Sequence, residues 1–187
     1  MSTLPFKGHF IKAAEPLDCL HLDVVGPITL PSKLGYRYFL TMVDQHTSFK
    51  ITKFLKHKSE VFDEFLIQQK LLGNLHARKI KRIVTDGGGE FVNQKFKDLA
   101  NVCGFTHVVA PPYTPEHDSF AERENWTILD KSRCLLLNSN LPNQYWAEAV
   151  NTAKFLTNII QTLLRNNYSP HYLWLKVPPK IRKIRSF

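Results

Sequence analysis

The strongest constraint on the fold lies between Val84 and Arg123, where two carboxylates stand at either end of a segment rich in turn residues. Asp86 follows a short apolar run and precedes three glycines, a pattern typical of a buried strand that ends in a turn. Glu122 stands at the opening of a predicted helix. A third carboxylate, Asp23, lies in an apolar run that Gly26-Pro27 terminates. Two strands and a helix therefore carry three acids that can converge at one point.

Converging carboxylates predict a site for divalent cations. Mg²⁺ takes oxygen ligands, usually one or two carboxylates together with waters and substrate phosphate oxygens. Two such ions about 3.5 to 4 Å apart can hold the attacking and leaving oxygens of an in-line phosphoryl displacement. Leu22 and Val24 crowd Asp23, and an unpaired buried carboxylate is costly, which favours a metal partner. We therefore predict that Asp23, Asp86 and Glu122 hold two Mg²⁺ or Mn²⁺ ions.

Each acid also has an interpretation that requires no bound metal. Asp23 is compatible with a polar position on an edge strand, and Asp86 with a turn aspartate before glycines. Ser119 and Glu122 form a capping-box pattern, in which the glutamate bonds to the cap amide instead of a metal. Glu90, one turn after Asp86, competes with Glu122 as the third ligand, or supports the site from behind.

Composition bounds the class of protein. A chain of 187 residues is long enough for one domain with a core. The 25 Lys and Arg against 16 Asp and Glu give a formal charge of +9, which suits DNA or RNA as a partner. The cysteines are odd in number and widely spaced, at Cys19, Cys103 and Cys134. This predicts buried thiols in a reducing, intracellular compartment. No Cys-x-x-Cys pair supports structural zinc, and no membrane-length apolar run is present.

The hydrophobic pattern predicts a mixed sheet with helices on both faces. Strand composition covers Leu17–Val25, Tyr36–Val43, Phe49–Leu55, Ile80–Thr85 and Thr106–Ala110. Helices are expected from an N-cap at Ser59 to Gly73 and Asn74, over Asn93–Cys103, from Glu122 to Asn138, over Asn143–Thr162, and as a last turn at Pro170–Leu175. Pro111–Asp118 is expected to be a loop.

The sequence frames around the acids resemble the catalytic core of copia-type retrotransposon integrases. The frames are Thr-Asp-x-Gly-Gly-Glu-Phe around Asp86 and Tyr-Thr-Pro-x-x-x-x-x-Ala-Glu-Arg around Glu122. Further matching segments are Gly35–Leu40, Phe54–Ser59 and Leu141–Ala149, so the resemblance extends from about Pro16 to Trp174. It implies a ribonuclease H-like fold with a five-stranded mixed sheet, with Asp23 on the central strand and Asp86 on its neighbour.

The resemblance also implies an activity and partners. Such a core carries out 3′-end processing and strand transfer, so we expect DNA, as element ends and target, as substrate, a homo-oligomer as the working form, no membrane association and a nuclear location during DNA chemistry. Arg123 and Asn125 retain the family pattern and are predicted nucleic-acid contacts. Lys79 and Arg82 are predicted phosphate contacts from their charge.

A second interpretation is a catalytically inactive, nucleic-acid-binding remnant of an integrase. We divide the chain into an extended lead-in (1–15), the catalytic core (16–165) and a basic C-terminal extension (166–187). The family's upstream zinc-binding segment is absent, so a truncated core is expected. Asp118-Ser119 replaces the usual Asn-Gly, and Trp126 replaces a residue that is commonly basic. A hydrolytic nuclease of the same fold ranks below both, because its typical four acids are not convincingly present.

Overall fold

A five-stranded mixed sheet forms the centre of the protein, as the sequence predicted. The computed structural model describes residues 13–110, 115–161 and 167–180, with only the backbone described for 115–119. The sheet has the order β3-β2-β1-β4-β5. Neighbours β1–β2 and β2–β3 are antiparallel, and β1–β4 and β4–β5 are parallel. The strands are β1 (Leu20–Val25), β2 (Tyr38–Asp44), β3 (Lys50–Leu55), β4 (Arg82–Thr85) and β5 (Thr106–Val109).

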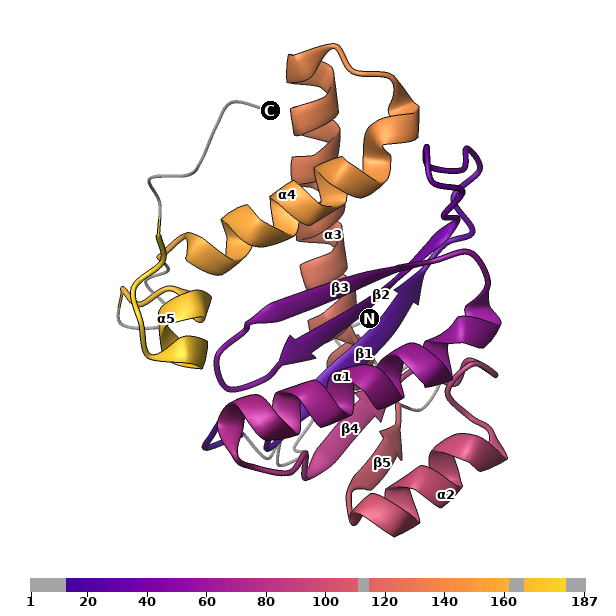
Figure 1. Cartoon of the computed structure of the whole chain (residues 1–187), viewed down its shortest axis with the longest axis vertical. Coiled ribbons are helices and arrows are strands. Elements are labelled where there is room, and N and C mark those ends of the chain that lie inside the picture. The colour runs from indigo at the N-terminus through magenta and orange to yellow at the C-terminus, as the bar shows by residue number, and fades with distance from the viewer. Residues whose placement is uncertain (1–12, 111–114, 162–166, 181–187) are drawn as a thin grey trace, which may run out of the picture.

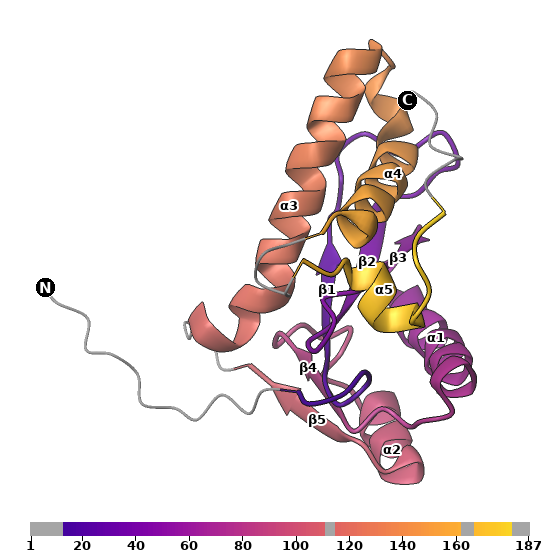
Figure 2. The same cartoon turned by 90° about the vertical axis from the view of Figure 1, so that its left-hand side faces the viewer.

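Helices cover both faces of this sheet. Figure 2 shows α3 on one side of the strands and α1 and α2 on the other. In Figure 1, α1 lies in front of the sheet and the long α3 crosses behind it. The helical elements are η1 (Lys58–Glu60), α1 (Val61–His76), α2 (Gln94–Cys103), α3 (Pro115–Ser139), η2 (Asn143–Tyr145), α4 (Trp146–Ile159) and α5 (Pro170–Leu175). Among the described residues, no helix combines the length and apolar character needed to cross a bilayer.

Strand alternation divides the core between the two faces. Leu20 and Leu22 of β1 point into a cluster with Phe65 of α1 and Phe96 of α2. The opposite face carries a second cluster, in which Phe39 packs with residues of α3 and α4, namely Ile128, Trp146, Ala147, Val150 and Ala153. Asp23 therefore belongs to the face that α3 covers, since it alternates with Leu22.

Four predicted helix boundaries are wrong, one of them the end of α4, which was expected at Thr162 and lies at Ile159. Ser59 is not the N-cap of α1, because η1 precedes that helix and the Glu60 carboxylate accepts the His57 N–H at 3.1 Å. Helix α1 also continues past Gly73 to His76 and ends at Ala77, whose φ is 50°. Helix α3 begins at Pro115, so half of the predicted loop Pro111–Asp118 is helical. Residues 111–114 lie outside the described part of the chain.

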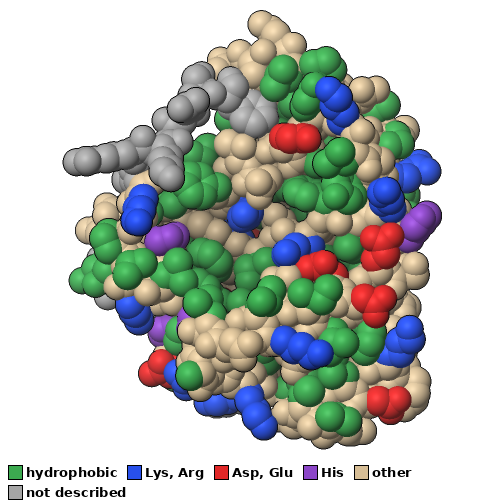
Figure 3. All heavy atoms as spheres, in the orientation of Figure 1, with side chains coloured by type: hydrophobic (Ala, Val, Ile, Leu, Met, Phe, Trp, Pro, Cys, Tyr) green, Lys and Arg blue, Asp and Glu red, His purple; other side chains and the backbone are tan. Residues whose placement is uncertain are grey.

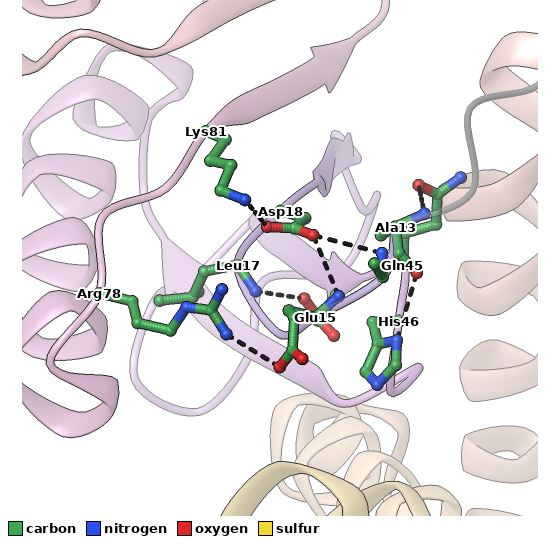
Figure 4. A network of polar contacts seen from close by, with 10 residues as sticks. Ala13, Glu15, Leu17, Asp18, Gln45, His46, Arg78 and Lys81 are labelled. Atoms are coloured by element: carbon green, nitrogen blue, oxygen red, sulfur yellow. Dashed lines mark hydrogen bonds and ion pairs between the residues drawn. The ribbon is translucent and has the colours of Figure 1, made fainter.

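The start of the described chain is bound to the sheet by polar contacts (Figure 4). The Asp44 carboxylate accepts the Leu17 N–H at 2.9 Å, and Lys81 pairs with Asp18 at 2.7 Å. Arg78 reaches Glu15 at 2.9 Å. Part of the predicted extended lead-in is therefore attached to the core, while residues 1–12 are not described.

The last helix also packs onto the core. Trp174 of α5 is 3% exposed and joins the cluster of Leu20 and Phe65. Its ring stacks on Phe49 at a centroid distance of 5.1 Å and contacts His76 at 4.2 Å. Residues 181–187, which hold most of the basic tail, lie outside the described residues.

Cysteine burial differs from the prediction. Cys19 is buried, Cys103 is half-buried and Cys134 is exposed. Cys134 belongs to α3, and the neighbouring Leu135 and Leu136, not Cys134, pack against the cluster of Phe39.

Candidate active site

Asp23 and Asp86 lie at the same end of two neighbouring parallel strands. The register pairs His21 of β1 with Val84 of β4. Asp23 is two residues beyond His21, and Asp86 is two residues beyond Val84, directly after the end of β4. Because the two strands run in the same direction, the two carboxylates lie at the same end of the sheet, where β1 and β4 both terminate.

Helix α3 contributes a direct partner for Asp23. Asn125 is 3% exposed, and its Nδ2 donates a hydrogen bond of 2.7 Å to Asp23 Oδ2. Upstream on the same helix, the ring of Phe120 covers His21 at a centroid distance of 4.8 Å. His21 is 2% exposed and lies 3.7 Å from Cys19 Sγ. His21 is thus packed within the protein, between Phe120 of α3 and Cys19.

The electrostatics link all three predicted acids. Burial raises the pKa of Asp23 above its usual value, and the hydrogen bond from Asn125 opposes this shift. The negative charges of Asp86 and Glu122 raise the same pKa further. The charges of Asp86 and Glu122 therefore disfavour the ionised form of Asp23, and a cation beside Asp23 would relieve that effect.

Glu122 is an exposed residue within α3. The prediction that Glu122 opens this helix is wrong, since α3 starts seven residues earlier, at Pro115. Ser119 consequently lies inside the helix, where it cannot serve as an N-cap, so the capping-box interpretation fails. Asn125 follows Glu122 by three residues and shares its side of the helix, which directs Glu122 toward the end of β1 that carries Asp23.

The carboxylates of Asp86 and Glu90, at the two ends of the glycine turn, have different partners. Asp86 Oδ1 accepts the N–H of Gly88 at 3.1 Å, in the manner of a turn aspartate. Glu90 instead pairs with Lys58, with 2.6 Å between Nζ and Oε1, and its side chain is 9% exposed. Glu90, the competing third ligand, therefore has a different partner in this structure.

A threonine and a histidine support the end of β4. The Thr85 hydroxyl lies 2.9 Å from the Asp86 carbonyl oxygen and 2.9 Å from His107 Nε2. Burial lowers the pKa of His107, which favours its neutral form. These contacts stabilise the strand end from which Asp86 projects.

The predicted nucleic-acid contacts occupy different places. Arg123 lies on α3 beside Glu122, whereas Arg82 begins β4, at the other end of the strand from Asp86, and its Nε donates to Cys19 Sγ at 3.3 Å. Lys79, also upstream of β4, lines an 850 Å³ groove between α1 and α2. The amide of Asn125 is buried against Asp23. Their contact with nucleic acid stays a prediction.

An exposed aromatic residue lies near the acids. Trp126, one turn after Glu122, is 61% exposed. Figure 3 shows the other side of the sheet, which α1 covers, and there basic and acidic side chains are interspersed among apolar ones. The excess of positive charge is therefore not gathered into one stripe on the α1 side.

The donor chemistry of the site fits a hard divalent cation, although the observed side-chain positions do not form a closed ligand shell. Within the described ranges, no group of three or more His, Cys, Asp or Glu lies close enough to hold a metal ion. Asn125 Oδ1, beside Asp23, is buried and has no hydrogen-bond partner among the described residues. This unsatisfied oxygen and the effect of the neighbouring acids on Asp23 both favour a positively charged or hydrogen-bonding occupant.

Sequence reasoning did not identify Lys58 and His107 as parts of this region. Lys58 is far from Asp86 in sequence and meets its turn only through the tertiary fold. His107 sits on the edge strand β5. The segment Phe54–Ser59 was part of a matching frame, and that frame was the one available signal for Lys58.

Comparison with known proteins places this geometry in context. Residues 13–115 match the family model described as "Integrase core domain". The chain is 33% identical over 184 residues to the Retrovirus-related Pol polyprotein from transposon RE2 of Arabidopsis thaliana, covering 98% of this chain and 12% of that protein. It is 37% identical over 142 residues to the corresponding polyprotein from transposon TNT 1-94 of Nicotiana tabacum, covering 76% and 11%. The chain thus spans about an eighth or less of these relatives.

Solved structures show the same fold. One, a cryoEM structure of the simian T-cell lymphotropic virus intasome in complex with PP2A regulatory subunit B56 gamma, matches with a TM-score of 0.73 and 20% identity, covering 100% of this chain and 63% of that one. The HTLV-2 integrase catalytic core domain in complex with magnesium, in a trimeric form, matches with a TM-score of 0.63 and 22% identity, covering 86% and 97%. The predicted ribonuclease H-like fold is therefore confirmed.

Proposed function

Because the chain belongs to the integrase core domain family, we propose that it is the catalytic core of a retrotransposon integrase that joins DNA 3′ ends to a target by polynucleotidyl transfer. The observation that carries this proposal is geometric: the parallel strands β1 and β4 bring Asp23 and Asp86 to the same end of the sheet, and Asn125 of α3 bonds directly to Asp23. Carboxylates gathered at the end of parallel strands are suited to holding divalent ions.

In this proposal Asp23, Asp86 and Glu122 would hold two Mg²⁺ or Mn²⁺ ions. When bound, such ions sharpen an attacking hydroxyl and stabilise a departing oxygen. The chain's own residues orient these groups. Asn125 holds one oxygen of Asp23 through its amide, and the Gly88 N–H holds one oxygen of Asp86, so both carboxylates have defined orientations.

In this proposal, residues of α3 contact the DNA. Arg123, beside Glu122, is suited to a phosphate contact. Trp126, exposed and one turn further on, is suited to stacking on an unpaired base. DNA ends and target DNA as partners, a homo-oligomeric working form and nuclear action belong to the same proposal. The oligomer is supported by the trimeric form of the HTLV-2 core.

A second candidate is a nucleic-acid-binding remnant without catalysis. It is favoured by the exposed indole of Trp126 at a position that is commonly basic in the family. A binding module would retain DNA affinity without metal, whereas an integrase would require the ions for chemistry.

The test is Mn²⁺-dependent strand joining on a branched DNA that mimics the joined product. We compare the unchanged protein with Glu122→Gln, and use Asp130→Asn as a matched control, since Asp130 is an exposed carboxylate on the same helix that pairs with Arg133. Loss of joining in Glu122→Gln alone supports the integrase. Equal background products from all three folded, DNA-binding proteins would favour the remnant.

A further inference from the structure

An ion pair joins the segment after β3 to the turn that follows Asp86. Lys58 Nζ lies 2.6 Å from Glu90 Oε1, and the Glu90 side chain is 9% exposed while that of Lys58 is 43% exposed. Lys58 belongs to η1, and Glu90 ends the glycine turn. A largely buried carboxylate therefore meets a cation that approaches it from solvent.

Glu90 lies directly beside Asp86. A Cβ atom built on Gly88 would lie 2.9 Å from Glu90 Oε2 and 3.0 Å from Asp86 Oδ1. Both carboxylates thus border the same side of Gly88. Glu90 is consequently a further acid next to Asp86, and its ion pair with Lys58 distinguishes it from Asp86.

The backbone of this turn is held without Lys58. Asn93 Nδ2 donates to the carbonyl oxygens of Gly89 and Glu90 at 3.2 and 2.9 Å, and the Phe91 N–H donates to the Gly88 carbonyl at 2.9 Å. Phe91 is fully buried. Removing Lys58 therefore releases the Glu90 carboxylate and leaves the turn in place.

We propose that Lys58 is a positioning residue, which by pairing with Glu90 keeps this carboxylate away from the cations that Asp86 would hold. The inference rests on the proposed function, since it concerns the same ions. The hydrogen bond to Glu90 raises the pKa of Lys58, and the charge of Asp86 acts in the same direction, so the ammonium stays charged at neutral pH. The pair thereby limits the site to three acids.

The test is a titration of the protein alone with Mn²⁺. Binding is measured from the electron paramagnetic resonance signal of the Mn²⁺ that remains free. In Lys58→Met, the freed Glu90 acts as a further oxygen ligand, so we expect affinity to rise about 10-fold, comparable to other effects of groups behind the ligands. Lys58→Met with Glu90→Gln returns to the unchanged protein's isotherm. Lys95→Met, a control that removes a second lysine from the same hollow, leaves the isotherm unchanged.

Three results would overturn the inference. They are unaltered binding in Lys58→Met, equal binding in the single and double variants, or the same gain in Lys95→Met, which would indicate a general charge effect. Lys58→Arg keeps the pair and serves as a second variant with normal binding if Lys58→Met does not fold. If the unchanged protein binds no Mn²⁺, the proposed function itself is overturned. If it binds Mn²⁺ and Asp86→Asn abolishes this binding, the site is the proposed one, and the result for Lys58→Met then tests the Lys58 inference alone.

Discussion

Asn125 and Asp23 are 102 positions apart in sequence, yet only 2.7 Å separates the amide nitrogen of one from a carboxylate oxygen of the other. This bond connects α3 to the central strand of the sheet. It also fixes the orientation of Asp23, one of the three predicted ligands, so Asn125 acts on the site through Asp23.

Replacing Asn125 with alanine is expected to lower strand joining by at least about 10-fold, because groups that orient metal ligands have effects of this size. The protein should still fold, since the Ile128 and Trp146 cluster is untouched. The measurement is the joining rate at rising Mn²⁺ concentration. Because a misoriented Asp23 weakens the hold on the ions, added Mn²⁺ should recover part of the rate, and a rate equal to that of the unchanged protein would contradict the positioning role.

Asp23→Asn is expected to stabilise the metal-free protein at neutral pH. The folded-state pKa of Asp23 is raised by burial and by neighbouring acids, so the folded protein binds this proton more tightly than the unfolded chain does. Its favourable contribution is full below the ordinary value of 3.8 and is lost as the pH rises through the folded-state pKa. Melting temperatures of both proteins should therefore differ at neutral pH and converge in acid; a constant difference would argue against the shift.

Glu124 is expected to stabilise the fold. Lys50, whose side chain is 5% exposed, meets Glu124 at 2.9 Å. Glu124→Gln leaves a buried ammonium poorly compensated, which should cost about 3 kcal/mol of unfolding free energy in a denaturant titration. Lys50→Met with Glu124→Leu should recover most of this loss. Asp130→Asn breaks only the exposed pair with Arg133 and should change stability by less than about 0.5 kcal/mol.

Trp174→Ala is expected to destabilise the protein by about 3 to 5 kcal/mol, the usual loss for a buried large aromatic residue. Trp174 is 3% exposed and stacks on Phe49. Denaturant unfolding measures the loss, and Val177→Ala, at a position that is 51% exposed, provides a control that should be nearly neutral. A chain that ends at residue 165 should lose at least as much. If that shorter chain kept full stability, the catalytic core would end where the sequence suggested.

The strands followed from the sequence because their signals are local: apolar runs that end in Gly-Pro or in glycines mark strand ends. The local pattern left the strand order open, and it was the family resemblance that implied neighbouring strands for Asp23 and Asp86, as the parallel pair β1–β4 shows. The alternation of Leu20, His21, Leu22 and Asp23 likewise agrees with the two faces of the sheet.

The boundaries of α1 and α3 could not be predicted in this way. Pro115 looked like part of a loop, but proline is compatible with the first turn of a helix, where its missing N–H is not needed. Gly73 was expected to end α1, but the buried Leu72 secures the last turns against the core, which outweighs the roughly 1 kcal/mol penalty of a helical glycine. The ion pairs of Lys58 with Glu90 and of Lys50 with Glu124 depend on tertiary contact alone.

The carboxylates of the candidate site come from β1, from the turn after β4 and from α3. During synthesis on the ribosome, the sheet strands emerge before the middle of α3 does, so a nascent chain that stops short of Asn125 has Asp23 without its amide partner. The three acids can therefore come together only after α3 has left the exit tunnel, so the candidate site is assembled by a contact between segments that are made far apart in time.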